Sequence, residues 1–390
     1  MKIIGISALY HDSAVTFIND GKIIEAIQEE RLTRVKHDAS FPEKSLKYIF
    51  QKYRLKIKDI DSIVFYDKPF LKFERLIETY LASAPRGFKT FKMSMPIWLN
   101  EKLFLKSFLI KYFKKLDKNF NKDKLFFSEH HLSHAASAFF PSPFNEAVIL
   151  TVDGVGEWAT STVSIGSNNS INIKKEINFP HSLGLLYSAF TYYCGFKVNS
   201  GEYKLMGLAP YGENKYSDII LRNIIDVKDD GSFRLDLKYF DYITGLKMVN
   251  KEFCNLFGKP ARRSEEDKIE QFHMDIAASI QNVLEIILLK ITKSLYNEYG
   301  IENLCLAGGV ALNCVANGKI LKKSGFKNIW IQPASGDAGG SLGASLAYWH
   351  LELGKGRILN KNDNMNGSYL GSEYSNNKIK VALEKKKLKF

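Results

Sequence analysis

The stretch from Ser128 to Val163 constrains this chain more than any other segment. Its first half places His130 and His134 four residues apart in a run of alanine, serine and phenylalanine. Such a run favours a helix, and residues four apart on a helix project from the same face. The sequence therefore predicts a helix that presents two imidazoles to one metal ion, with His131 pointing elsewhere, either in a structural role or as a residue that supports the ligands. The same spacing also arises by chance, so the pair alone leaves a purely structural interpretation open.

The second half of this stretch predicts a buried strand that ends in a carboxylate. Ala147 to Val152 are apolar and rich in strand-forming side chains, and Asp153, Gly154 and Gly156 follow. Glycines let backbone N–H groups approach an anion closely, so the segment suits a metal ion beside a phosphate. An Asp-Gly pair after a strand is also a common turn, and that alternative stays open for the segment alone.

Length and charge limit the classes of protein to consider. A chain of 390 residues is long enough for two or three domains or for one bilobal unit. The formal net charge of +13 raises nucleic acid or an anionic membrane as a partner. The lysines, however, are spread over surface-like helical segments and form no basic stripe interleaved with aromatic residues, which argues against nucleic acid. No apolar run approaches the roughly 20 residues that span a bilayer, so no membrane partner is expected.

The cysteines and the N-terminus predict the cellular compartment. None of the 4 cysteines has the CxxC spacing of a metal or redox site, so they are expected to be reduced thiols. The chain starts directly with a strand-like segment and shows no basic region followed by an apolar core and a cleavage site. We therefore expect a soluble, cytoplasmic protein.

The beginning of the chain predicts three successive antiparallel strands within residues 2–28. The pair Asp20-Gly21 between apolar runs is a strong hairpin signal. The turn after the first strand holds Tyr10, His11 and Asp12. A glycine-bearing first strand that leads into a polar turn and an antiparallel partner is how actin- and hexokinase-like folds begin, and there the turn faces a nucleotide phosphate.

Two polar segments are open between a structural and a ligand-binding interpretation. Residues 29–37 form a dense charged run that contains Arg31 and Lys36, which is either a solvated surface or an anion-binding loop. Residues 200–212 are predicted to be a compact glycine- and proline-containing loop that carries Glu202 and Lys204. Between the first strands and the central stretch, residues 69–124 are predicted to be a helical insertion without catalytic features.

The C-terminal third repeats the order of strand, glycine turn and helix. A strand over 303–307 is followed by Gly308, Gly309 and Asn313, and then by a helix. That order exposes helix N–H groups to a phosphate or lets a nucleobase lie against the backbone. A second strand ends near Pro333, and Asp337 then opens a glycine-rich helix.

Two carboxylates, Asp153 and Asp337, therefore stand at matching strand ends. Together with His130 and His134 they predict a site of two imidazoles and two carboxylates. Mixed ligands of this kind suit iron, manganese or zinc.

Motifs along nearly the whole chain resemble those of the O-carbamoyltransferases that modify Nod factors and antibiotics, the NodU/CmcH type. In chain order the motifs are Tyr10-His11-Asp12-Ser13-Ala14, Glu30-Arg31 with Lys36-His37, His130-His131-Leu132-Ser133-His134-Ala135, Thr151-Val152-Asp153-Gly154, Gly201-Glu202-Tyr203-Lys204-Leu205-Met206-Gly207-Leu208, Gly308-Gly309-Val310-Ala311-Leu312-Asn313 and Gly336-Asp337-Ala338-Gly339. The resemblance implies a bilobal α/β protein with the duplicated actin/hexokinase-like (ribonuclease H-like) fold, related to the tRNA threonylcarbamoyl-transfer enzyme. Its implied lobes are residues 1–144 with the insertion at 69–124, and residues 145–353.

The resemblance also implies the chemistry, which is transfer of a carbamoyl group from carbamoyl-adenylate to a hydroxyl of a sugar or natural product. It implies iron ligands at His130, His134, Asp153 and Asp337. It implies His11 as the base, and Arg31 and Lys36 as cations on the phosphate side. It implies nucleotide-binding positions at Gly154, Gly156, Glu202, Lys204, Gly308, Gly309 and Asn313.

The expected ligands follow from that resemblance. They are Fe²⁺, with Mn²⁺ or Zn²⁺ as alternatives, carbamoyl phosphate and ATP or their adenylate product, and a hydroxyl acceptor. Family members continue with a domain that makes carbamoyl-adenylate, whereas residues 354–390 are expected to be only a linker and the start of such a domain. A separate protein that forms the adenylate is therefore an expected partner. A non-catalytic adenine-nucleotide-binding remnant and a tRNA-modifying threonylcarbamoyl transferase remain alternatives.

Overall fold

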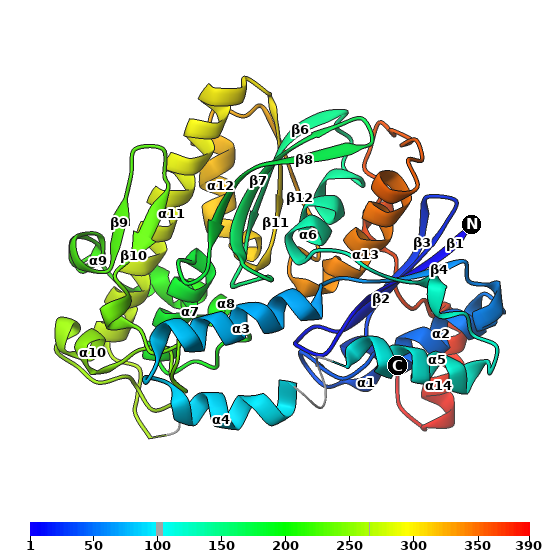
Figure 1. Cartoon of the computed structure of the whole chain (residues 1–390), viewed down its shortest axis with the longest axis horizontal. Helices are drawn as coiled ribbons and strands as arrows, with labels where there is room; N and C mark the ends of the chain where they lie inside the picture. Colours follow the sequence, from blue (N-terminus) through cyan, green and yellow to red (C-terminus); the bar gives the residue numbers. More distant parts are fainter. Residues whose placement is uncertain (99–103, 265) are drawn as a thin grey trace.

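Two five-stranded sheets with the same strand order form the centres of the two halves of the molecule (Figure 1). The structure is a computed structural model and describes residues 1–98, 104–264 and 266–390. In each sheet, three successive antiparallel strands are followed by two later strands that pair in parallel beside the first. This repeated order is the duplicated ribonuclease H-like arrangement of the actin/hexokinase-like fold, so the predicted fold class is confirmed.

The first sheet has the order β3-β2-β1-β4-β5. Its strands are β1 (Lys2–Ser7), β2 (Ala14–Asn19), β3 (Lys22–Gln28), β4 (Ser62–Phe65) and β5 (Leu125–Phe127). The central strands β1 and β4 are nearly continuous apolar runs because helices cover both faces of the sheet. The helices of this half are α1 (Glu30–Thr33), α2 (Glu43–Lys52), α3 (Pro69–Ser83), α4 (Phe88–Ile97) and α5 (Leu105–Leu116).

The second sheet has the matching order β8-β7-β6-β11-β12. Its strands are β6 (Glu146–Val152), β7 (Ala159–Ser167), β8 (Ser170–Asn178), β11 (Asn303–Ala307) and β12 (Asn328–Ile331). A separate hairpin consists of β9 (Ile225–Val227) and β10 (Phe233–Leu235). The helices of this half are α7 (Leu183–Tyr193), α8 (Glu202–Leu208), α9 (Ser217–Asn223), α10 (Lys251–Phe257), α11 (Gln271–Tyr299) and α12 (Cys314–Lys323).

Two buried helices, α6 (His130–Phe139) and α13 (Asp337–Ala347), lie side by side between the two sheets (Figure 1). They approach closely because α13 is built almost entirely of small residues. A Cβ at Gly343 would lie 1.7 Å from the carbonyl oxygen of Ser133 on α6. This contact sets the relative position of the two helices that begin at His130 and Asp337.

Three local predictions are wrong. Residues 202–208, predicted to be part of a loop, form helix α8, because the helix-forming run Glu202–Met206 outweighs the flanking glycines. The amphipathic pattern of residues 43–56 predicts a helix as far as Lys56, but helix α2 ends at Lys52. One strand and one short helix are predicted for residues 368–390, but no strand forms there, and α14 (Asn376–Lys385) follows a 3₁₀ turn that ends at Ser368. The carbonyl of Leu370 merely accepts a hydrogen bond from the backbone of Ala26 at the sheet edge.

All 4 cysteines are free thiols, as predicted.

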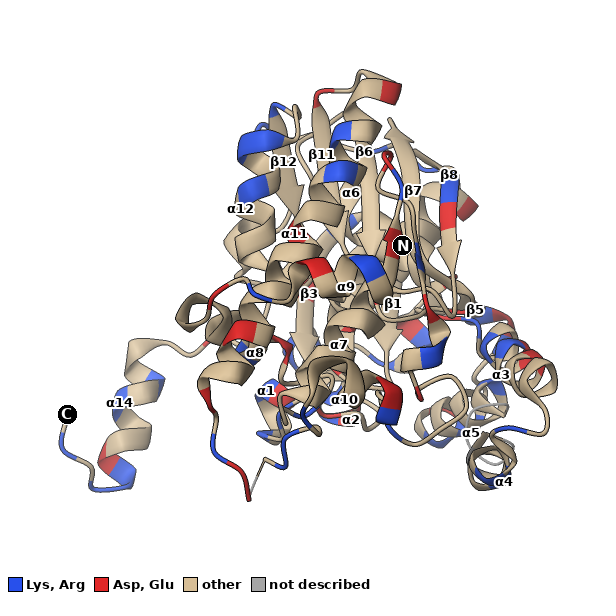
Figure 2. Ribbon diagram, turned by 90° about the vertical axis from the view of Figure 1, so that its left-hand side faces the viewer, with Lys and Arg blue, Asp and Glu red and all other residues tan. Residues whose placement is uncertain are grey.

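The charged residues are distributed as the sequence suggests. In the view of Figure 2, Lys and Arg are spread over α3, β8, α12 and α14 among acidic residues, without one continuous basic stripe. None of the described helices combines the length and the apolar character needed to cross a membrane.

Arg357 attaches the predicted linker to the end of α6. Its guanidinium donates hydrogen bonds of 2.6–3.0 Å to the carbonyl oxygens of Phe139, Phe140, Ser142 and Phe144. Carbonyls at and after a helix C-terminus lack helical partners and favour a cation. The segment that follows α13 is thus fixed to the helix that carries His130 and His134.

Lower pH should destabilise the protein through His350, which is 5% exposed. Its Nδ1 donates to the carbonyl of Lys355, but burial and the nearby Arg357 charge lower the imidazole pKa to about 4. An unfolded chain binds this proton near pH 6.5. The contribution of neutral His350 to the free energy of unfolding is therefore fully present above pH 6.5. It is lost as the pH falls toward 4, and the loss is up to about 3 kcal/mol.

Urea unfolding between pH 7.5 and 5 measures this effect. His350→Gln should unfold with a flatter pH dependence than the wild type. An identical pH dependence in both proteins would contradict the assignment to His350.

Candidate functional site

Helix α6 begins at His130 because a carboxylate from another segment caps it. Both oxygens of Glu157 lie 3.1 Å from the backbone nitrogen of His130. The residue at the N-cap position, Glu129, makes no capping hydrogen bond with its side chain. A carboxylate at a helix N-terminus satisfies free N–H groups and interacts favourably with the helix dipole. Glu157 also accepts a hydrogen bond from the backbone of Lys68, so it links α6 to the start of α3.

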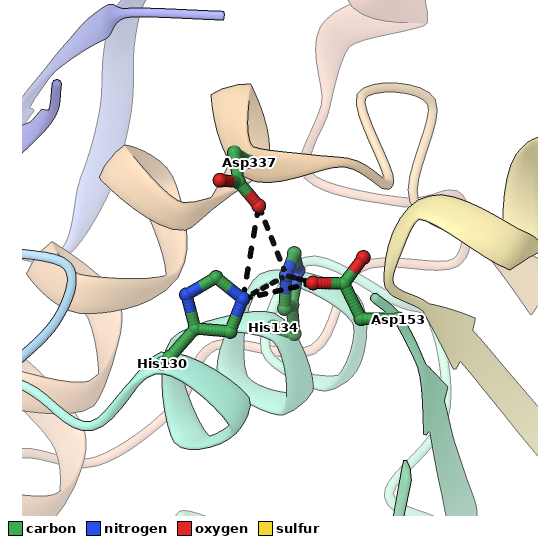
Figure 3. Close-up of side chains that lie close together, drawn as sticks. All are labelled: His130, His134, Asp153 and Asp337. Carbon is green, nitrogen blue, oxygen red and sulfur yellow. Dashed lines mark hydrogen bonds and ion pairs between the residues drawn. The ribbon is translucent and has the colours of Figure 1, made fainter. Parts of the chain in front are cut away.

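Four side chains converge beside the first turn of α6 (Figure 3). His130 Nε2 lies 3.0 Å from Asp153 Oδ2 and 3.1 Å from His134 Nε2. Asp337 Oδ1 lies 3.7 Å from His130 Nε2 and 3.6 Å from His134 Nε2. The ligand atoms of all four residues lie within 4.8 Å of one another. The structure thus brings together the two imidazoles and two carboxylates that the sequence places far apart.

The electrostatics of this cluster favour positive charge at its centre. Burial lowers the pKa of His134, but hydrogen bonding to Asp153 and Asp337 raises it, to about 9. Burial raises the pKa of Asp153, but the two imidazoles hold it well below its usual range. Two facing Nε2 atoms with two carboxylates need a proton or a metal cation between them. The Nδ1 atoms of His130 and His134 are buried without a hydrogen-bond partner among the described residues.

His131 stands outside the cluster, as predicted. Its Nδ1 lies 2.7 Å from the hydroxyl of Thr151. Burial and the neighbouring imidazoles lower its pKa to about 3, so the ring is neutral. It is a packed structural residue between the two candidate ligands.

His11 borders the cluster from the turn between β1 and β2. Its Nε2 lies 3.8 Å from Asp337 Oδ2, the oxygen to which the Tyr66 hydroxyl donates at 3.2 Å. Burial lowers the pKa of His11, but the charges of Asp337 and Asp12 raise it, to about 9. The imidazole therefore faces the same space as the four-residue cluster.

Gly308, Gly309 and Asn313, predicted to bind the nucleotide, lie between β11 and α12, and Gly309 contacts the cluster directly. The N–H of Gly309 donates to Asp153 Oδ1 at 2.9 Å. Gly308 has a φ of 89°, and a Cβ there would lie 2.3 Å from the Val152 carbonyl oxygen, so glycine is required. Asn313 caps α12 by accepting from the backbone of Ala316 and bonds Gln281.

The predicted glycines after β6 differ in their surroundings. A Cβ at Gly156 would lie 2.9 Å from the ring of His131 and 3.1 Å from His130. Gly154 has only Leu185 nearby, at 3.9 Å, so its backbone is open on that side.

The charged residues predicted to line the nucleotide pocket differ in their surroundings: some are hydrogen-bonded within the protein and others are exposed. Glu202 accepts from the hydroxyl of Ser188 at 2.7 Å, and Lys36 donates to the hydroxyl of Tyr203 at 3.1 Å across the two halves. Lys204 is exposed. The Arg31 side chain is 66% exposed and pairs with its neighbour Glu30, so the structure does not bring it to the cluster.

Several residues of the site carried no predicted role. They are Glu157, which caps α6, Tyr66, which donates to Asp337, and the pair Asp12 and His37 behind His11. Tyr66 directly follows β4, so its place at a strand end was the available signal. The capping by Glu157 had no local signal, because it depends on a loop 27 residues away from the helix start.

Comparison with known proteins decides the family. The model of the carbamoyltransferase N-terminus family matches residues 2–346. This chain belongs to the carbamoyltransferase family. The predicted family resemblance is confirmed.

Two relatives of this carbamoyltransferase-family chain are longer than it is. It is 59% identical to the uncharacterized protein sll1178 of Synechocystis sp. over 98% of the chain and 62% of that protein. It is 34% identical to the nodulation protein NolNO of Sinorhizobium fredii over 90% of the chain and 50% of that protein. The chain thus spans half to about three fifths of the length of these curated relatives.

Solved structures resemble the chain only distantly. Full-length HypF in its phosphate- and nucleotide-bound form matches 90% of the chain and 55% of that protein, with a TM-score of 0.47 and 12% identity. Component A of the Acidaminococcus fermentans (R)-2-hydroxyglutaryl-CoA dehydratase matches 91% of the chain and all of that protein, with a TM-score of 0.46 and 14% identity. Neither likeness supports a functional conclusion.

Proposed function

We propose that this chain carries the transfer site of an O-carbamoyltransferase. There a carbamoyl group moves from carbamoyl-adenylate to a hydroxyl of a sugar or another small-molecule acceptor. One observation carries the proposal: in a carbamoyltransferase-family chain, two imidazoles and two carboxylates converge on one point, and His11 borders that point.

The four converging residues fit a divalent cation such as Fe²⁺, Mn²⁺ or Zn²⁺. Imidazole and carboxylate ligands together suit borderline transition metals. His130, His134, Asp153 and Asp337 would hold the ion, while the Gly309 N–H and the Tyr66 hydroxyl orient the two carboxylates. The bound cation would supply positive charge for the phosphate of the departing adenylate.

His11 is the proposed general base. The acceptor hydroxyl gives its proton to His11 Nε2, and its oxygen forms a bond to the carbamoyl carbon. The bond between that carbon and the phosphate oxygen breaks, and the nucleoside monophosphate leaves with the electron pair. A cation bound at Asp153 and Asp337 would offset the charges that raise the His11 pKa, which favours the neutral imidazole that accepts a proton.

The remaining proposed roles concern nucleotide binding. Gly308, Gly309 and Asn313 follow β11 at the start of α12, where glycines without side chains let the nucleoside of the adenylate lie close against the backbone. Lys36 contacts Tyr203 at the boundary of the two halves, where a cation suits the phosphate side. Carbamoyl phosphate and ATP are proposed as the source of the adenylate, formed by a separate domain or protein.

Direct assay of the purified chain tests this proposal. The chain is incubated with Fe²⁺, carbamoyl-adenylate and a panel of hydroxyl acceptors, and carbamate esters are detected by mass spectrometry. His11→Gln should lower the rate by about 100-fold or more, the usual contribution of a general base. His350→Gln, a change at a distant buried imidazole, should leave the rate at pH 7.5 unchanged.

Two results would contradict carbamoyl transfer. One is a folded, metal-loaded wild type that forms no product with any acceptor. The other is tight adenylate binding without turnover, which would identify a non-catalytic nucleotide-binding module instead.

A further inference from the structure

Behind His11, one carboxylate lies between two imidazoles. Asp12 Oδ2 is 3.0 Å from His11 Nδ1, and Asp12 Oδ1 is 2.7 Å from His37 Nδ1. A carboxylate oxygen only accepts, so in both contacts the imidazole Nδ1–H donates. The three residues form a continuous hydrogen-bonded line that ends at His11 Nε2, 3.8 Å from Asp337.

The backbone holds this line in an unfavourable conformation. Asp12 has a φ of 54° and His37 a φ of 55°, in the left-handed region that residues other than glycine rarely occupy. Two backbone hydrogen bonds join the turn that carries Asp12 to the loop that carries His37. The Ser13 N–H donates to the Asp38 carbonyl at 2.9 Å, and the Leu9 N–H donates to the Ala39 carbonyl at 3.1 Å. Both residues are thus held in an uncommon backbone conformation in which their side chains meet.

His37 itself does not reach the candidate metal cluster. Its Nδ1 bonds Asp12, and its Nε2 is buried without a hydrogen-bond partner in the described part of the chain. Any effect of His37 on the reacting atoms must therefore pass through Asp12 and His11.

We propose that Asp12 and His37 are positioning residues for His11. Asp12 holds the His11 Nδ1–H and so directs Nε2 toward the acceptor hydroxyl, while His37 fixes the second oxygen of Asp12. This is the division of roles by which a carboxylate orients a catalytic imidazole in hydrolytic triads. The inference rests on the proposed carbamoyl transfer, in which His11 Nε2 takes the acceptor proton.

Kinetics of matched variants test the line from His37 to His11. His37→Gly suits the positive φ and removes the ring, whereas His37→Asn places an amide N–H near the position of Nδ1 and also tolerates that backbone conformation. We expect His37→Gly to lower kcat about 10- to 100-fold with KM for carbamoyl-adenylate changed less than about threefold, and His37→Asn to recover most of kcat. Asp12→Asn should lower kcat about 100-fold or more.

A double variant separates positioning from general damage. In a His11→Gln background, Asp12→Asn should lower kcat by less than about threefold, because the group that Asp12 orients is already gone. A full additional loss in that background would overturn the proposal. Equal kcat losses in His37→Gly and His37→Asn would also overturn it.

A second measurement decides the inference independently of catalysis. Nitrogen-15 NMR of histidine-labelled, zinc-loaded protein should show low-field Nδ1–H protons of His11 and His37 that exchange slowly with water. The His11 signal should disappear in Asp12→Asn and broaden in His37→Gly. If it stays unchanged in both, the positioning role fails, even if the wild type catalyses transfer. If it behaves as expected in a wild type without activity, the arrangement stands and only the proposed function fails.

Metal analysis distinguishes the positioning role of His37 from a role as a metal ligand. Asp12, Glu30 and His37 also have ligand atoms within 4.8 Å of one another. The proposal expects equal metal content in wild type and His37→Gly. A metal equivalent that is lost only in His37→Gly would mean that these residues hold an ion, and would overturn the positioning role.

Discussion

His134→Ala and Asp337→Ala should each abolish stoichiometric metal binding. The wild type is expected to retain about one equivalent of Fe²⁺, Mn²⁺ or Zn²⁺ after dialysis, and each variant less than about a tenth of that. The reason is geometric. His134 Nε2 and Asp337 Oδ1 lie 3.6 Å apart and face the same point as His130 and Asp153, so each variant removes one of four ligand atoms. Metal analysis of the purified, dialysed proteins measures this.

The adjacent imidazole provides a matched control. His131 lies between the two candidate ligands in the sequence, but its ring bonds Thr151 instead. His131→Gln should therefore keep the metal content of the wild type.

Thermal unfolding with and without added Mn²⁺ provides a second readout, because an ion that binds only the folded state raises its stability by mass action. Added Mn²⁺ should raise Tm for the wild type and His131→Gln but not for His134→Ala or Asp337→Ala. Equal metal content in all four proteins would refute the site.

Gly343→Ala should both destabilise the fold and disturb the cluster. A Cβ at position 343 would lie 1.7 Å from the Ser133 carbonyl oxygen and 2.9 Å from the Ser137 nitrogen. Both are backbone atoms of α6 and cannot rotate away, so α13 and α6 must separate. Overpacking of a close-packed core costs about 1–3 kcal/mol, and a backbone clash of this depth should reach at least the upper part of that range. Urea unfolding at pH 7.5 measures the loss.

The same separation should weaken metal binding. Ser133 lies between His130 and His134 on α6, and α13 begins with Asp337. Moving the helices apart pulls the carboxylate away from the imidazoles, so the metal affinity of Gly343→Ala should fall along with its stability.

Gly318 on α12 provides the control. A Cβ there would meet nothing within 4 Å. Gly318→Ala in this helix should stabilise the protein by about 0.5–1 kcal/mol, because alanine loses less conformational entropy than glycine on folding. Wild-type stability and metal affinity in Gly343→Ala would show that the helices can separate without loss.

Local pattern was enough to predict much of this fold. The spacing of His130 and His134 predicts one helix face, and the structure has them on the first turns of α6. The turn at Gly308 and Gly309 and the helix that follows it, α12, also agree with the prediction. Helical periodicity, hairpin signals and strand propensity depend on residues a few positions apart, and such short-range features can be predicted from one sequence.

Other local features were misread because neighbouring signals conflicted. The glycines and proline around residues 200–212 suggested a loop, but the side chains from Glu202 to Met206 form α8. The strand before Asp337 was predicted to end near Pro333, whereas β12 ends at Ile331; the prediction that Asp337 opens a helix is confirmed by α13. In both cases the residue types were informative and the element boundary was not.

The sequence by itself determined the residue types of the candidate site, the helix that pairs His130 with His134, and the strand that delivers Asp153. Only the tertiary structure decided that Asp337 meets them, that Glu157 caps α6, and that Asp12 joins His11 to His37. These contacts join residues 25 to 207 positions apart, such as His37 with Asp12 and Asp337 with His130. They depend on the close approach of α6 and α13 at Gly343 and on two loops held in the left-handed region. Packing and loop strain are properties of the folded whole, so no short stretch of the chain encodes them alone.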